Sequence, residues 1–94
     1  MSKMELQFDK ALTKLSGFKL GEDMYTTQVK DKIDFNDDNL IIVIPDRVDL
    51  IGSSFIQGFF KEIVDTIGLV GIANQISIES SIPGIKDMII QNLN

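Results

Sequence analysis

Five consecutive apolar residues, 40–44, form the most distinct hydrophobic run of the chain, and four of the five are β-branched. The run is short, polar residues 36–39 precede it, and Pro45, which has no N–H to donate, follows it. These features favour a strand, although periodicity alone would also allow a buried helix. An unbroken apolar run is typical of a strand covered on both faces, so we predict a central, buried strand here.

The stretch after this strand repeats apolar residues at helical spacing, with polar side chains on the opposite side. Ser54 and Gln57 have the spacing of a capping box, in which the serine side chain accepts a hydrogen bond from the Gln57 N–H. Gly68 is a natural helix end. We therefore predict an amphipathic helix over residues 55–67, with Ser54 as its N-cap, whose buried face consists of Phe55, Ile56, Phe59, Phe60, Ile63, Val64 and Ile67.

The N-terminal third carries weaker patterns. Residues 4–8 alternate apolar and polar, which predicts a half-buried strand near a sheet edge. Residues 11–18 fit either a second strand that forms a hairpin with the first or a loop that turns at a Ser-Gly pair, and we favour the hairpin. Residues 21–33 start with acidic side chains, as helices often do, and predict a short helix. Its apolar stripe is Tyr25, Val29 and Ile33.

The C-terminal third adds a strand and a helix. Residues 68–74 contain two glycines and predict a connection, with room for one helical turn, and residues 75–79 alternate as a strand does. Pro83 fits a first helical turn. The inner face of this last helix would be Ile82, Ile85, Met88, Ile89 and Leu93. The element order β(β)αβαβα predicts one α/β domain over residues 1–94, with helices packed on a mixed β-sheet.

Composition narrows the chemistry. The 94 residues include no cysteine, which removes disulfides and thiol chemistry, and no histidine, the usual general base and metal ligand. The net charge of −5 disfavours binding to nucleic acid. No apolar run approaches the ~18 residues of a membrane span, and no secretory signal is visible. We expect a cytoplasmic protein with no catalytic set, no metal, no cofactor and no membrane contact.

Residues 50–55, Leu-Ile-Gly-Ser-Ser-Phe after an apolar strand, resemble the centre of STAS domains, the anti-sigma-factor-antagonist fold. In that family a strand ends in a loop that reads roughly Asp-Ser-Ser/Thr-Gly, and a helix follows. The chain is more similar to the STAS-like family of unknown function (DUF4325), whose members carry a Ser-Ser-Phe type signature at this helix start. Residues 75–86 also look like that family's last strand and helix start, so the resemblance extends over residues 20–93.

The resemblance implies a phosphorylation switch, because anti-sigma antagonists are phosphorylated by the partner kinase on a serine in this loop. Ser53 occupies the matching place, and Ser54 follows it. A phosphate at a helix N-terminus is also favoured physically, since free N–H groups point at it. Gly52 stands where the family usually has Asp, and Phe55, which stands where it usually has Gly, crowds the approach. The competing interpretation is that both serines are only cap and turn residues.

Three other features have a functional and a structural interpretation. Asp46 and Asp49 flank Arg47 and could bind a cation or a partner's basic group, but two carboxylates are a weak metal pattern and a solvated loop explains them. Gly58 would cost about 1 kcal/mol relative to Ala inside a helix. Close packing against a backbone, either a strand beneath the helix or a partner, would explain it. The stripe Phe55, Phe59 and Phe60 is either a binding face or core, and core is favoured.

Two functional hypotheses follow. The first is a non-catalytic regulatory module that binds a protein partner, which the resemblance implies to be a GHKL-type ATPase or kinase; a homodimer stays open. The predicted contact surface is Asp46, Arg47, Asp49, Gly52, Ser53 and Gln57. The alternative is a small acidic carrier protein modified on a helix-opening serine. Carriers need Asp-Ser-Leu where this chain has Gly52-Ser53-Ser54, and they are all-helical.

Overall fold

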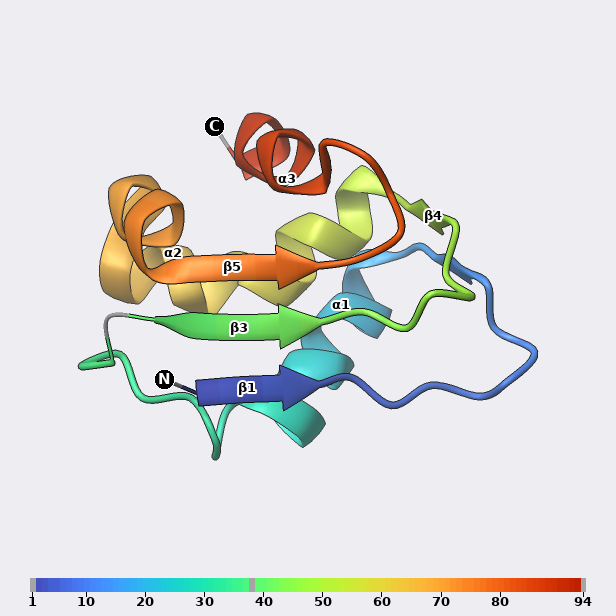
Figure 1. Cartoon of the computed structure of the whole chain (residues 1–94), viewed down its shortest axis with the longest axis horizontal. Coiled ribbons are helices and arrows are strands. Elements are labelled where there is room, and N and C mark those ends of the chain that lie inside the picture. Colours follow the sequence, from blue (N-terminus) through green and yellow to red (C-terminus); the bar gives the residue numbers. More distant parts are fainter. Residues whose placement is uncertain (1, 38, 94) are drawn as a thin grey trace.

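The main sheet consists of three parallel strands in the part of the chain that the computed structural model describes, residues 2–37 and 39–93 (Figure 1). The strands are β1 (Ser2–Glu5), β3 (Leu40–Val43) and β5 (Ile76–Glu79), in the order β1-β3-β5. The predicted central strand is confirmed, and an edge strand is present, but it covers Ser2–Glu5 instead of the predicted residues 4–8. The prediction of a mixed sheet is wrong, because each of these strands connects to the next through a helix and returns in the same direction.

The two crossover helical segments lie behind this sheet, and the last helix lies beside the edge strand β5 (Figure 1). In α1 (Phe18–Met24) the chain is α-helical and it continues as a π-helical turn, η1 (Tyr25–Val29). Helix α2 is Ser53–Gln75, and α3 is Ile85–Leu93. Figure 1 shows α1 and α2 behind the strands, on one face. Right-handed crossovers that add strands in one direction place their helices on the same face, which explains the two-layer α/β architecture.

A second, smaller pairing replaces the predicted N-terminal hairpin. β2 (Lys14–Leu15) pairs in parallel with β4 (Leu50–Ile51), and not with β1. The pairing continues where the Gly52 N–H donates to the Leu15 carbonyl at 2.7 Å. Leu15 and Ile51 are both buried, so this long-range pairing inserts two apolar side chains into the core. A local hairpin would have left both of them without that burial.

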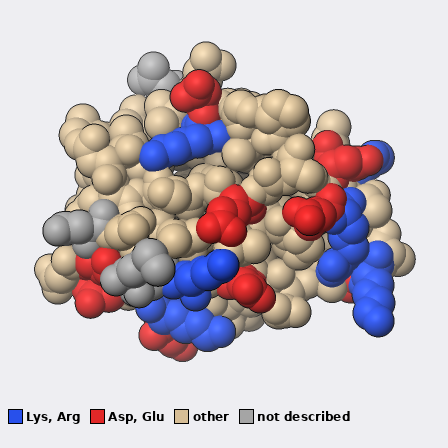
Figure 2. Space-filling model, in the orientation of Figure 1, with Lys and Arg blue, Asp and Glu red and all other residues tan. Residues whose placement is uncertain are grey.

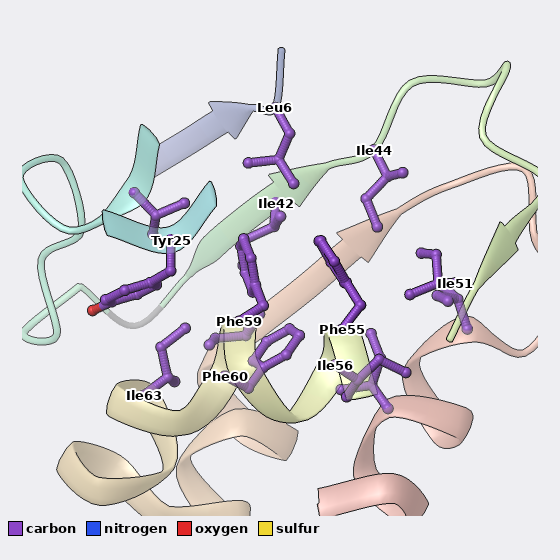
Figure 3. Close-up of a cluster of buried hydrophobic side chains, with 14 of the residues drawn as sticks. Leu6, Tyr25, Ile42, Ile44, Ile51, Phe55, Ile56, Phe59, Phe60 and Ile63 are labelled. Carbon is purple, nitrogen blue, oxygen red and sulfur yellow. The ribbon is translucent and has the colours of Figure 1, made fainter. Parts of the chain in front are cut away.

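The predicted helix face is the centre of the core. Phe55, Phe59 and Phe60 are 2–3% exposed, which confirms the core interpretation. Figure 3 shows Leu6, Ile42 and Ile44 pointing from the strand side of the core toward these rings. Phe59 stacks on Phe55 with ring centroids 5.8 Å apart and meets Phe60 edge-on at 5.0 Å.

Helices α1 and α2 cross at two glycines. A Cβ atom on Gly58 would lie 2.1 Å from the Phe18 carbonyl oxygen, and one on Gly21 would lie 2.3 Å from the Phe55 carbonyl oxygen. Both distances are far below van der Waals contact, so the two backbones approach closely only because neither residue has a side chain. The expected close backbone contact at Gly58 is therefore present, but it is made by the start of α1 and not by a strand or a partner.

Gly68 ends the regular part of α2, as predicted. Its φ of 70° and ψ of 177° interrupt the helical geometry, and a second helical segment continues to Gln75. Glycine adopts a positive φ without the steric strain that a side chain would cause. The break redirects the chain from the end of the long helix toward β5.

The two faces of the main sheet differ in burial. Met4, Leu40, Ile42 and Ile76 are buried against the helices. On the other face Ile41 and Val43 are only half-buried, so the prediction that β3 is covered on both faces is wrong. The cause is the topology, because both crossover helices lie on one side. We call the uncovered side the open face; its residues are Lys3, Glu5, Ile41, Val43, Ser77 and Glu79.

Candidate functional site

The loop between β3 and α2 is held by its backbone. The Val48 N–H closes a turn onto the Pro45 carbonyl at 3.0 Å, and the Val48 side chain is fully buried. The Asp49 N–H donates to the Thr13 carbonyl at 2.8 Å. Together with the β2–β4 pairing, these bonds fix the loop against residues 13–15. The exposed side chains of the loop are therefore presented from an anchored backbone.

The three charged residues predicted beside this loop do not converge on one site. Arg47 donates from Nη2 to the Phe8 carbonyl at 2.6 Å, and Asp49 pairs with Lys14 at 3.1 Å. Asp46 is exposed, and its carbonyl accepts a hydrogen bond from Ser81 Oγ at 3.1 Å. Within residues 2–37 and 39–93, no three His, Cys, Asp or Glu side chains gather in a way that could hold a metal ion.

Asp46 and Arg47 lie instead at the rim of an open groove of about 340 Å³. The groove occupies the carboxyl ends of β1 and β3, where α/β proteins commonly bind ligands. Its other lining residues include Glu5, Gln7, Val43 and Pro45. Ser53 and Gln57 do not line it, so the predicted contact surface divides into a groove at the strand ends and a separate helix start.

The helix start differs from the predicted capping box. The N-cap of α2 is Gly52, not Ser54, and it has extended backbone geometry and no side-chain cap. The Gly52 carbonyl accepts the first helical bond, from the Ile56 N–H at 3.1 Å. Ser54 lies inside the first turn, and its Oγ accepts from the Gly17 N–H at 3.2 Å. The prediction was wrong because this serine joins the starts of two helices instead of capping its own.

Ser53 is the first residue of α2 and is exposed. Within the described residues its hydroxyl has no hydrogen-bond partner, in contrast to the hydroxyl of Ser54. The neighbouring N–H groups of a first helical turn have no intrahelical acceptor, and they carry the positive end of the helix dipole. Phe55 does not crowd this place, since its ring is buried in the core. The geometry at Ser53 is able to accept a phosphate.

Gln57 is exposed one turn further along α2. Its Nε2 lies 3.5 Å from the Asn92 carbonyl of α3, which is at the long limit of a hydrogen bond. The side chain does not reach back to the helix start, as the capping-box prediction required. It therefore remains available on the surface beside Ser53.

A groove that the sequence did not reveal lies between η1 and α2. It measures about 270 Å³, and its walls carry Glu22, Lys30, Lys61, Glu62 and Asp65 around Tyr25. Burial, the negative charge of Glu62 and a hydrogen bond with that carboxylate raise the pKa of Tyr25 to about 12. Lys30 pairs with the same carboxylate at 3.7 Å. Tyr25 was predicted only as part of an apolar stripe, and no local pattern signals its partner on α2.

Comparisons with protein-family models, with curated proteins and with solved structures returned no match for this chain. In the described part of the chain, no helix is both long and apolar enough to cross a membrane. The three parallel strands also separate the fold from the all-helical architecture of carrier proteins.

Proposed function

We propose that this chain is a non-catalytic regulatory module of the STAS-like type, which acts in the cytoplasm by binding a protein partner. The observation that carries the proposal is the contrast between the two adjacent serines. Ser54 is engaged by the Gly17 N–H, whereas Ser53 is exposed at the start of a long helix. A modification at Ser53 would change the surface charge without breaking a hydrogen bond that the fold uses.

The surroundings of Ser53 support a protein contact. Leu50, three residues before Ser53, is 49% exposed, so a partner docked at Ser53 would also meet an apolar side chain. Asp49, next to Leu50 in the chain, adds a carboxylate that is held by Lys14. By its resemblance to STAS-like proteins, the partner is a GHKL-type ATPase or kinase.

The experiment is to incubate the protein with a purified GHKL-type kinase and ATP and to locate any phosphate by mass spectrometry. We expect phosphate on Ser53 in wild type and in Ser54→Ala, and none in Ser53→Ala. Binding of each variant to the kinase is then measured by calorimetry. Ser53→Asp should weaken or strengthen binding at least tenfold through its charge.

The matched control is Thr66→Asp, which places the same charge on the exposed side of α2 well away from the helix start. It should bind the kinase as wild type does. Equal binding by Ser53→Asp and wild type, with no phosphate on Ser53, would leave the two serines as structural residues and overturn the proposal.

A further inference from the structure

The open face carries an ordered pattern of side chains. The strand register aligns Lys3, Ile41 and Ser77 in one row across the sheet. Two residues further along the strands, Glu5, Val43 and Glu79 form the next row. Each row therefore has an apolar residue on the central strand with polar or charged residues on the two outer strands. Figure 2 shows this side of the molecule, on which charged residues of both signs are interspersed with uncharged residues.

This face is incompletely covered in the single chain. Lys3 and Glu79 lie on the two outer strands, so their ion pair at 3.8 Å spans the central strand. The Lys3 and Glu79 side chains remain about half exposed, and Ile41 and Val43 between these outer strands are only half-buried. Exposed pairs of this kind contribute little stability. Parallel sheets are otherwise nearly always covered on both faces, which leaves this face in need of a second layer.

We propose that the open face is the contact surface for a second copy of this chain. A two-fold axis that runs across the strands, midway between the two rows, places each row over the other row of the partner copy. Lys3 then faces Glu5 of the partner subunit, and Ile41 faces Val43 of the partner subunit. The symmetry repeats both contacts, so the dimer forms two Lys3–Glu5 pairs beside an apolar centre, in place of the Lys3–Glu79 pair of each chain.

The charges on the open face favour the two-fold axis across the strands over the main alternative, an axis parallel to them. A two-fold axis parallel to the strands would place Glu5 over Glu79 of the partner subunit, and like charges across an interface are unfavourable. Beyond the end of β1, the backbone N–H and carbonyl of Gln7 are bonded to Gln28 of η1 at 2.6 and 2.7 Å, so a strand paired with the β1 edge could not continue onto Gln7.

The size of the face predicts a weak dimer. Six side chains per copy are far fewer than the roughly 20–30 residues a side of a standard interface, so association should be weak and should depend strongly on concentration. Face-to-face packing requires the two sheets to lie about 10 Å apart, which side chains of this size fill. In the dimer, Lys3 exchanges its exposed pairing with Glu79 for the partner's Glu5.

The test is sedimentation of the full chain over a series of concentrations, with two charge reversals and their combination. Lys3→Glu and Glu5→Lys each place like charges across the interface and should weaken the dimer at least about tenfold. The double variant Lys3→Glu/Glu5→Lys restores opposite charges and should return the dissociation constant to within about threefold of wild type. The control Lys19→Glu, which removes a similar exposed pair on α1, should dimerise as wild type does.

Because charge reversal could affect folding, circular dichroism of each variant accompanies the sedimentation. A second probe, Ile41→Gln, removes apolar contact at the centre and should also weaken the dimer. A wild-type chain that stays monomeric up to about 1 mM would overturn the proposal. So would a double variant that is no better than either single one, because the dimer would then use a different surface.

Discussion

The two faces of the main sheet are made by the same strands and differ in what covers them. Ile41 and Ile42 are identical neighbours on β3, yet Ile42 is 1% exposed and Ile41 is half-buried. Ile42 points to the layer of α1 and α2, where aromatic rings and a glycine crossing fill the space. Ile41 points to the open face, where no described helix packs and the Lys3–Glu79 pair is exposed. Burial here follows from the direction of two crossover connections, not from the type of side chain.

The largest expected effect lies at the centre of the covered face. Phe59→Ala removes a ring that contacts Tyr25, Phe55 and Phe60. We expect the free energy of unfolding to fall by about 3–5 kcal/mol, a large share of the stability of a small domain. Urea unfolding followed by circular dichroism measures it. A decrease of only a few tenths would mean that this helix face is not packed as described.

The neighbouring isoleucines compare the two faces directly. Ile42→Ala should lower the free energy of unfolding by about 2–5 kcal/mol, because it leaves a cavity between sheet and helices. Ile41→Ala should lower it by less than about 1 kcal/mol when measured at low concentration, because its site is partly solvated. Similar losses in the two variants would show that both faces of β3 are covered in the monomer.

The close crossing of α1 and α2 is tested by adding a methyl group at Gly58. Gly58→Ala places a methyl group against the Phe18 carbonyl, which is backbone and can only move together with α1. We expect a loss of about 1–3 kcal/mol in spite of the better helix propensity of alanine. Gly52→Ala is the control, because its methyl group would meet nothing closer than 3.5 Å. Its effect should stay within about 1 kcal/mol of wild type, and an equal loss in both would argue against a backbone clash.

Tyr25, at the margin of the covered layer, should make stability depend on alkaline pH. Its pKa is raised from 10.0 to about 12 in the folded chain, so the folded state holds this proton more tightly than the unfolded state. The resulting stability is fully present below about pH 10 and is lost as the pH rises to about 12. The free energy of unfolding of wild type, measured relative to that of Tyr25→Phe, should therefore fall by on the order of 1–3 kcal/mol over that range. Because the chain has only one tyrosine, ultraviolet absorbance follows the ionisation directly.

The smallest effects are expected where α1 and α2 begin. Ser54→Ala removes the acceptor of the Gly17 N–H and should lower the free energy of unfolding by about 0.5–1.5 kcal/mol. Ser53→Ala removes an exposed hydroxyl and should stay within about 0.5 kcal/mol of wild type. Thermal unfolding of the two variants measures both effects. The reverse order would mean that Ser53, and not Ser54, holds the helix start.

Part of the candidate site could be read from the sequence. Ser53 and the charged residues before it were identified because they lie between a predicted strand and the start of a predicted amphipathic helix. The groove at Tyr25 was not, because Tyr25 and Glu62 are 37 positions apart and come together only when η1 packs on α2. The role of Ser54 was misread for the same reason, since its hydrogen-bond partner Gly17 lies in a distant segment.

The sequence by itself determined the elements whose cause is local. The β-branched run of β3, the apolar face of α2 and the helix break at Gly68 each depend on side chains within a few residues, so their patterns predicted them. Only the tertiary structure decided the parallel order of the strands, the β2–β4 pairing and the crossing of Gly21 and Gly58. These features depend on which distant backbones meet. The open face belongs with them, because a strand's own residues do not specify on which side its neighbours' helices will pack.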